Sequence, residues 1–376
     1  MVRLTDSKQG TSRFFSCLLT LTVLFSVFGA PLSANAQLPN VEKPIEDIRV
    51  MPGGQTVGVK LKTVGVVVIG HHQIERADSK RVSPAELARI QLGDVILKVN
   101  GERVKSAKQF AELVQKGATT GDAASDANQV APLNLQIVRD GQTMTSSILP
   151  ILDKHAQKYR LGIYVRDQAV GIGTLTFYSP LYKMYGALGH MITDADTHVP
   201  LSVENGEILP SEVTSIRKGE KGQPGEKRAQ IVTHSPPFGN IEKNTPFGIF
   251  GELSMAPIDG KIMKPLPIAG RSEVREGPAK MLTVIEGRKV EAFDIEIVHL
   301  NKQSEPETKG MVVRVTDPRL LEKSGGIVQG MSGSPIIQNG KLVGAVTHVF
   351  VNDPTSGYGC YIEWMLRDAG VKVKAA

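Results

Sequence analysis

Apolar and polar residues alternate in short runs along most of the chain, a pattern that predicts strands. Thr56–Leu61 and Gly65–Ile69 show this alternation, and Leu133–Val138 repeats it before an Asp-Gly turn. In Ser106–Gln115 the apolar residues instead recur three and four positions apart, as on one face of an amphipathic helix. The first part of the chain is therefore predicted to be a mixed α and β domain.

From Leu161 onward, short apolar runs separated by glycine and proline predict a mainly β domain. Met281–Ile285 and Leu342–Val351 are typical runs, and Cys360–Asp368 near the end has a helical pattern. Roughly 215 residues of this kind suit a closed or paired β-barrel. We assign this second domain to residues 160–376.

The N-terminal segment has the pattern of a signal peptide or membrane anchor. Three basic residues in the first 13 precede the uncharged run Phe14–Ala30, and the small-x-small pattern of Ala34–Ala36 follows. The run has 17 residues, which is at the lower edge of what crosses a bilayer. We therefore predict a signal peptide or anchor over 1–36, a spacer over 37–48, and a chain exported across, or anchored to, the cytoplasmic membrane.

Charge and cysteine content narrow the function classes. The chain has a formal net charge of +6, but its densest basic stretch, Arg217–Arg228, is interleaved with acidic residues, and only 5% of residues are aromatic. Nucleic-acid binding is therefore not expected, whereas a weak attraction to an anionic membrane surface is. Removal of residues 1–36 would leave Cys360 as the one cysteine, which excludes a disulfide within the chain and a cysteine-based zinc site. No metal-binding motif occurs, and we expect no cofactor.

One short motif typical of a helix start and two typical of strands follow one another in the first domain. Ser83-Pro84-Ala85-x-x-Ala88 is followed by Leu92–Ile96 and by Val99–Gly101. This order resembles a PDZ domain, which we assign to residues 49–153. The resemblance implies a site where strand addition holds a peptide's C-terminal carboxylate. That site would use the N–H groups of Thr56, Val57, Gly58 and Val59, unless this segment is an ordinary strand with a glycine break.

A glycine-rich turn near the C-terminus has the composition of a nucleophile loop. Gly330-Met331-Ser332-Gly333-Ser334-Pro335 is followed by an Asn-Gly hairpin. Small residues allow the backbone to bend so that the N–H groups of Gly330 and Ser332 face one point, as an oxyanion hole requires. This turn resembles the nucleophile loop of trypsin-like proteases. We predict Ser332 as the nucleophile rather than Ser334, because glycine flanks Ser332 on the positions that shape the hole.

A serine nucleophile needs a base. Of the eight histidines, His190 lies in a glycine-tight bend between apolar runs, early in the second domain. This context favours His190 as the base. His348, on the strand after the serine hairpin, is the competing candidate.

A third group must orient the imidazole and stabilise its charged form. Asp317 follows an apolar strand and lies fifteen residues before Ser332. We predict Asp317 in this role. The alternatives are Asp194, Asp196 and Asp294.

Several motifs together resemble the stage IV sporulation protein B peptidases. They are Gly189–Ile192, Val315–Asp317, and the long run from Gly326 to Gly359. The resemblance covers nearly the whole chain and implies an α+β PDZ domain followed by a mainly β, trypsin-like double-barrel serine peptidase. It also implies a catalytic triad of His190, Asp317 and Ser332.

The resemblance further implies a role in endospore formation. Such peptidases enter the space between the forespore and mother-cell membranes, process their own N-terminal region, and cleave a membrane-bound regulator of an intramembrane metalloprotease. That cleavage triggers activation of a late sigma factor. A general quality-control protease of the cell envelope and a non-catalytic PDZ binding protein are the alternatives, although quality-control proteases usually place PDZ domains after the protease domain.

Overall fold

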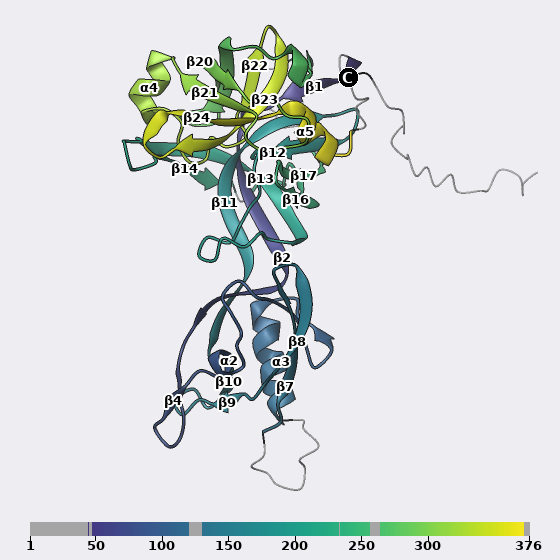
Figure 1. Cartoon of the computed structure of the whole chain (residues 1–376), viewed down its shortest axis with the longest axis vertical. Helices are drawn as coiled ribbons and strands as arrows, with labels where there is room; N and C mark the ends of the chain where they lie inside the picture. The colour runs from purple at the N-terminus through teal and green to yellow at the C-terminus, as the bar shows by residue number, and fades with distance from the viewer. Residues whose placement is uncertain (1–43, 45–46, 120–129, 233, 256–263, 372–376) are drawn as a thin grey trace, which may run out of the picture. The chain divides into compact units, whose positions relative to one another are not determined.

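The computed structural model describes residues 44, 47–119, 130–232, 234–255 and 264–371 (Figure 1). The predicted signal segment and residues 37–43, 45 and 46 of the predicted spacer lie outside the described residues. Within the described part, no helix is both long enough and apolar enough to cross a membrane.

A small α+β unit is built around helix α3 (Ala107–Thr119). The helix buries Phe110, Leu113 and Val114, which have the spacing that the sequence predicted, although α3 continues four residues beyond Gln115. These side chains pack in one cluster with strand residues on the adjoining sheet. The remaining elements of the unit are β3 (Ile74–Glu75), β4 (Arg81–Val82), α2 (Pro84–Leu87), β5 (Val95–Val99), β6 (Glu102–Arg103), β7 (Leu133–Arg139), β8 (Gln142–Ile148), β9 (Ile151–Leu152) and β10 (Tyr159–Arg160).

Helix α2 begins as the sequence predicts. The Ser83 side chain accepts a hydrogen bond from the Glu86 N–H, and Pro84 occupies the first turn, where its missing N–H has no consequence.

Two long strands connect this unit to the rest of the chain. β2 (Thr56–His71) and β11 (Ile163–Ser179) pair antiparallel from the Ile163–His71 pair to the Thr174–Thr56 pair. Val66 of β2 packs in the core of the small unit, whereas Val57 packs in a different cluster with Leu175 of β11. The division between the two parts therefore runs through β2 and β11, and not at residue 49 or residue 153.

The second part begins with the strands around the first half of β2. A sheet runs in the order β16-β17-β12-β11-β2, with β13 paired to the other edge of β2. Ile48, from the predicted spacer, is buried in the core of this part. The strands not yet given are β1 (Arg49–Pro52), β12 (Met184–Ala187), β13 (Val203–Arg217), β14 (Glu226–Ile231), β15 (Gly239–Asn240), β16 (Lys243–Thr245), β17 (Gly248–Glu252) and β18 (Leu266–Pro267).

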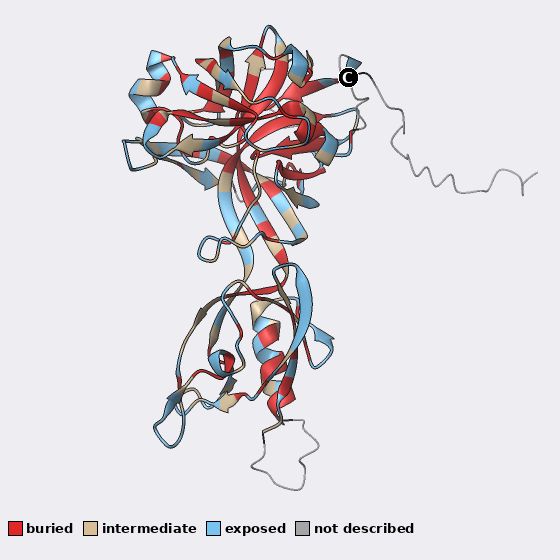
Figure 2. Cartoon of the chain, in the orientation of Figure 1, coloured by how far each residue is buried: buried red, intermediate tan, exposed pale blue. Residues whose placement is uncertain are grey.

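A closed barrel in the order β19-β20-β21-β24-β23-β22 completes the second part. Much of the barrel's strand surface is buried (red in Figure 2). The fully buried residues of its core include Met281, Phe293, Val313, Ile336 and Val346. The barrel and its flanking helices are η2 (Arg271–Glu273), β19 (Gly277–Val284), β20 (Val290–Leu300), β21 (Met311–Val315), α4 (Pro318–Ser324), β22 (Pro335–Gln338), β23 (Lys341–Phe350), β24 (Asp353–Tyr361) and α5 (Ile362–Asp368).

The predicted combination of a small α+β unit with a mainly β part is confirmed. Among the described residues one barrel closes, and the strands around β2 and β11 form an extended sheet rather than a second closed barrel. The predicted C-terminal helix begins at Ile362, because Cys360 and Tyr361 complete β24.

Candidate active site

The serine loop is a tight turn that glycine makes possible. Gly330 and Gly333 have positive φ values of 93° and 91°. A β-carbon on Gly333 would lie 2.2 Å from the carbonyl oxygen of Thr174. Only glycine therefore fits at position 333, and the turn places the partly exposed Ser332 at its apex.

Backbone hydrogen bonds of the preceding carbonyl groups fix the directions of the two N–H groups predicted to form the oxyanion hole. The Lys227 N–H donates to the Gln329 carbonyl (2.8 Å), and the Ser334 N–H donates to the Met331 carbonyl (3.0 Å). In a trans peptide the N–H points opposite to the C=O, so these bonds fix the directions of the Gly330 and Ser332 N–H groups. Among the described residues neither N–H has an acceptor, as an oxyanion hole requires.

Strand β11 holds the loop from behind. The Thr174 hydroxyl donates to the Gly330 carbonyl (2.9 Å), and the Thr176 hydroxyl donates to the Gly333 carbonyl (2.8 Å). The Thr174 N–H also donates to the Ser332 carbonyl (3.0 Å). The shape of the nucleophile loop therefore depends on a strand more than 150 residues away in sequence.

His190 lies in the turn after β12, next to the serine loop. Its Nδ1 is 2.9 Å from the Met191 carbonyl oxygen, a contact that fits an Nδ1–H donor and leaves Nε2 as the basic nitrogen. Burial lowers the pKa of His190, and the bond to Met191 opposes this shift in part. The imidazole is thereby kept neutral, as a general base must be.

Ser332 and His190 line one cavity of about 960 Å³. The Ser332 hydroxyl donates to the Thr347 carbonyl (2.8 Å), and no hydrogen bond joins it to His190 among the described residues. The Thr347 carbonyl is available because the β23–β24 pairing shifts register between Val346 and His348. Ser332 is therefore in a resting position and must rotate to reach the base.

His348 faces the same cavity. Its ring centroid is 4.9 Å from that of His190. Desolvation, followed by the charges of His190 and Lys309, lowers the pKa of His348 to about 4. The structure thus brings both candidate bases to the serine, and His348 is uncharged at neutral pH.

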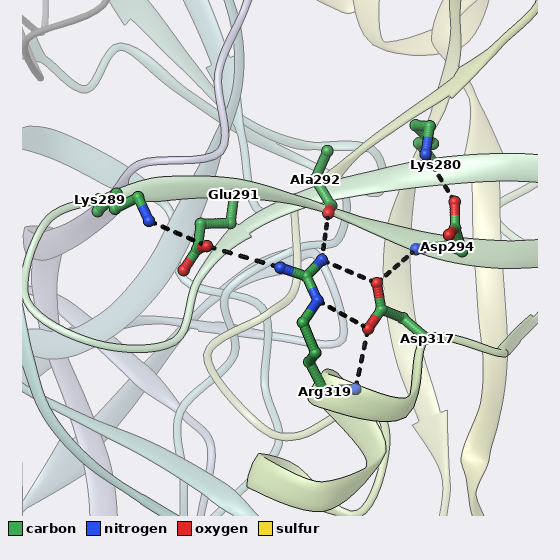
Figure 3. A network of polar contacts seen from close by, with 7 residues as sticks. All are labelled: Lys280, Lys289, Glu291, Ala292, Asp294, Asp317 and Arg319. Carbon is green, nitrogen blue, oxygen red and sulfur yellow. Dashed lines mark hydrogen bonds and ion pairs between the residues drawn. The ribbon is translucent and has the colours of Figure 1, made fainter.

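Asp317 lies elsewhere, at the start of helix α4 (Figure 3). Its carboxylate accepts hydrogen bonds from Arg319 through the backbone N–H (2.9 Å), Nε (3.2 Å) and Nη2 (2.9 Å). It also accepts one from the Asp294 N–H (3.3 Å). These bonds, with Arg319 first, lower the pKa of Asp317. Asp317 is not among the residues that line the cavity, and among the described residues it contacts no histidine. Its triad role stays a prediction from the resemblance.

The alternative carboxylates are also bound to other groups. Asp194 lines the cavity but accepts hydrogen bonds from Arg166 (2.6 Å) and Thr197 (3.0 Å), and Asp196 pairs with the same arginine. Asp294 pairs with Lys280. Within the described part of the chain, the contact that orients His190 comes from a backbone carbonyl, and from no carboxylate.

The predicted peptide-binding segment of the PDZ domain needs correction. This segment lies at the start of β2 and consists of Thr56, Val57, Gly58 and Val59, all of which are buried. The segment pairs with β11 along one edge, and from Val57 onward it also pairs with β13 along the other edge. Strand addition requires an unpaired edge, so the prediction for this segment is wrong. An edge that remains unpaired among the described residues is that of β11 from Ile163 to Gly173, opposite β2.

Four positioning residues were missed in the sequence: Met191, Thr174, Thr176 and Thr347. Thr174 and Thr176 are two positions apart in β11, which places their hydroxyls on one face of the strand. Which loop that face contacts depends on the tertiary fold.

Comparison with known protein families identifies the relatives of this site. Residues 157–366 match the family described as SpoIVB peptidase S55, and residues 78–121 match the PDZ domain family. The chain belongs to the SpoIVB peptidase S55 family. It is a serine peptidase with a PDZ domain, as the motifs around His190 and Ser332 predict.

Matches among solved structures include a PDZ domain and a protease. One is the PDZ domain of an SdrC-like protein from Listeria monocytogenes, 17% identical with a TM-score of 0.19, covering 27% of this chain and 87% of the other. Another is the Rv3671c protease of M. tuberculosis in its active form, 16% identical with a TM-score of 0.30, covering 55% of this chain and 76% of the other. An inactive serine-to-alanine mutant of that protease is 16% identical with a TM-score of 0.29, covering 55% and 84%.

Proposed function

We propose that this SpoIVB-type peptidase is an exported signalling endopeptidase of endospore formation. It processes its own N-terminal region and then cleaves a membrane-bound regulator of an intramembrane metalloprotease, in the space between the forespore and mother-cell membranes. Family membership supports this role. The observation that carries the chemistry is the cavity shared by Ser332 and His190, with the Gly330 and Ser332 N–H groups unpaired within the described chain.

The residues of the site supply an acyl-transfer mechanism. Ser332 leaves the Thr347 carbonyl and attacks the scissile carbonyl carbon while His190 Nε2 takes the hydroxyl proton. The Gly330 and Ser332 N–H groups donate to the oxyanion that forms. His190 then gives the proton to the leaving amine, and a water molecule, activated by His190, hydrolyses the acyl-enzyme.

Self-processing is proposed to occur before Ile48. Ile48 is 1% exposed and Val50 is 1% exposed, so a peptide bond in this stretch is held in the core. A protease requires an extended, accessible segment. Cleavage between Ala36 and Ile48 would release the N-terminal segment and leave the core intact.

The test compares the exported region from Gln37 with its Ser332→Ala variant, and follows the N-terminus by mass spectrometry. The proposal expects the native protein to shorten and the variant to stay intact, unless native protein is added in trans. The candidate membrane regulator is then offered to both. An envelope quality-control protease would instead degrade unfolded casein and the regulator alike, whereas a signalling enzyme cuts the regulator at one or few bonds. Failure of the native protein to cut itself and the regulator would contradict the proposal.

A further inference from the structure

The active-site cavity has two chemically different sides. One side is formed by loops and strands of the closed barrel together with the loop between β13 and β14, and we call it the barrel-side subsite. Its residues are Pro224, Thr308, Ile327, Val328, Val349 and Val351.

Backbone contacts hold the walls of the barrel-side subsite together. The Gly222 N–H donates to the Val351 carbonyl (2.9 Å), which brings the loop of Pro224 to the end of β23. A β-carbon on Gly225 would lie 2.6 Å from Val328, so that loop packs directly on the irregular segment that precedes the nucleophile. A β-carbon on Gly357 would likewise lie 2.9 Å from Ile327. The subsite therefore adjoins Ser332 through residues on both sides of it in the sequence.

The six residues of the barrel-side subsite include no charged side chain. Gln329 and His348 of the same barrel also line the cavity, and His348 is uncharged at neutral pH. Thr308 supplies its hydroxyl, and the other five residues are apolar. Val351 is 51% exposed and lines the same cavity as Ser332. Apolar surface exposed next to a reacting group gains free energy when an apolar side chain covers it. A charged side chain placed there would lose water without gaining an ionic partner.

The opposite side of the cavity is different. It is formed by the unpaired edge of β11 with Gln168 and Val170, and it ends at the ion pair of Arg166 with Asp194 (2.6 Å). Val170 on this side is 63% exposed, so it can serve as the control position for Val351 on the barrel side. The two valines allow the two sides to be tested separately.

We propose that the barrel-side subsite selects an uncharged aliphatic side chain of the substrate next to the scissile bond. The peptidase thus cuts beside Leu, Ile, Val or Met and rejects Asp, Glu, Lys and Arg at that position. The inference rests on the serine peptidase activity and names the substrate class of the same site. We expect kcat/KM to be at least about 100-fold lower for a charged residue than for leucine.

The test uses a mixed peptide library, with cleavage positions read by mass spectrometry. The native protein should show an aliphatic preference at one position beside the cut. V351D places a carboxylate in the subsite and should shift that position alone toward Lys and Arg. V170D should change a different position, and L181D, at a residue that is 69% exposed and outside the cavity lining, should change none.

A fluorophosphonate probe that labels the active serine separates the two possible failures. A native protein that neither labels nor cuts would overturn the peptidase function itself. A V351D protein that labels and cuts with the native aliphatic preference would overturn the subsite and leave the function standing. Should the aspartate abolish labelling, V351T keeps the shape of valine; an aliphatic preference weakened several-fold would support the subsite, and an unchanged one would overturn it.

Discussion

At the scale of single residues, Lys227 is buried, which its position in a charged stretch of the sequence did not predict. It is 2% exposed, and its Nζ donates to the hydroxyls of Thr56 (3.3 Å) and Thr283 (3.0 Å). Among the described residues no carboxylate pairs with it. Burial therefore lowers the pKa of Lys227 to about 7. The same residue directs the Gly330 N–H through its backbone bond to Gln329, so it lies immediately behind the oxyanion hole.

This burial predicts a pH-dependent stability. Between the folded pKa of about 7 and the ordinary lysine value of 10.5, the unfolded chain binds more protons, so the free energy of unfolding rises with pH across that window. Lys227→Met should flatten this rise and stabilise the fold at pH 7 by on the order of 2 kcal/mol. Urea unfolding at pH 7 and pH 9, on a Ser332→Ala background, measures both effects. The exposed Lys221→Met is the control, and a rise that survives in Lys227→Met would disprove this account.

A second residue-scale prediction separates the two histidines. His190 must be neutral to accept the Ser332 proton, and its pKa is lowered by burial, so kcat/KM should fall on the acid side at a pH below 6.5. If His348 were the base, the fall would lie near pH 4. We expect His190→Gln to lose at least about 1,000-fold in kcat/KM and His348→Phe to keep the acid limb of the native protein. An intact pH profile in His190→Gln would instead assign the base to His348.

At the scale of elements, the strand β11 has three functions. It pairs with β2 over most of its length, presents an unpaired edge to the cavity, and holds the serine loop through Thr174 and Thr176. A strand fixes such contacts more rigidly than a loop, because its ladder determines the direction of every side chain. The nucleophile loop therefore takes its geometry from β11.

Thr174→Val tests this dependence. The change keeps the side-chain shape but removes the hydrogen bond to the Gly330 carbonyl, which should cost about 1 kcal/mol of stability and lower kcat about tenfold with little change in KM. Thr174→Ser should restore most of the rate. Thr214→Val removes a hydroxyl bond on an exposed part of β13 and serves as the matched control. Equal kcat values for the Thr174→Val and Thr214→Val variants would contradict a role for β11 in holding the loop.

At the scale of the whole molecule, the PDZ unit is inserted into the peptidase part and does not simply precede it. Ile48, Val50 and Val57 lie in peptidase core clusters, and Gly58 pairs with both β11 and β13. The peptidase part therefore consists of residues from about 48 to 62 together with those from about 168 onward.

Two shortened chains distinguish insertion from simple succession. A chain of residues 160–376 lacks β1 and β2, so we expect it to be unfolded by circular dichroism and unlabelled by the serine probe. A chain in which an Asn-Gly turn replaces residues 63–167 joins the paired residues Lys62 and Gln168 as a hairpin, and it should unfold cooperatively and label at Ser332. Folding of the 160–376 chain alone would contradict the insertion.

The features that depend on short-range physics can be predicted from the sequence. Helix α3, the Ser83 cap of α2 and the glycine turn around Ser332 follow from periodicity, capping and permitted backbone angles within a few residues. The family and the enzyme class follow from motifs of the same length. Only the tertiary fold shows that Thr56–Val59 has no free edge and that threonines of β11 support the serine loop. These facts depend on which strands pair across more than a hundred residues, and local spacing contains no information about such partners.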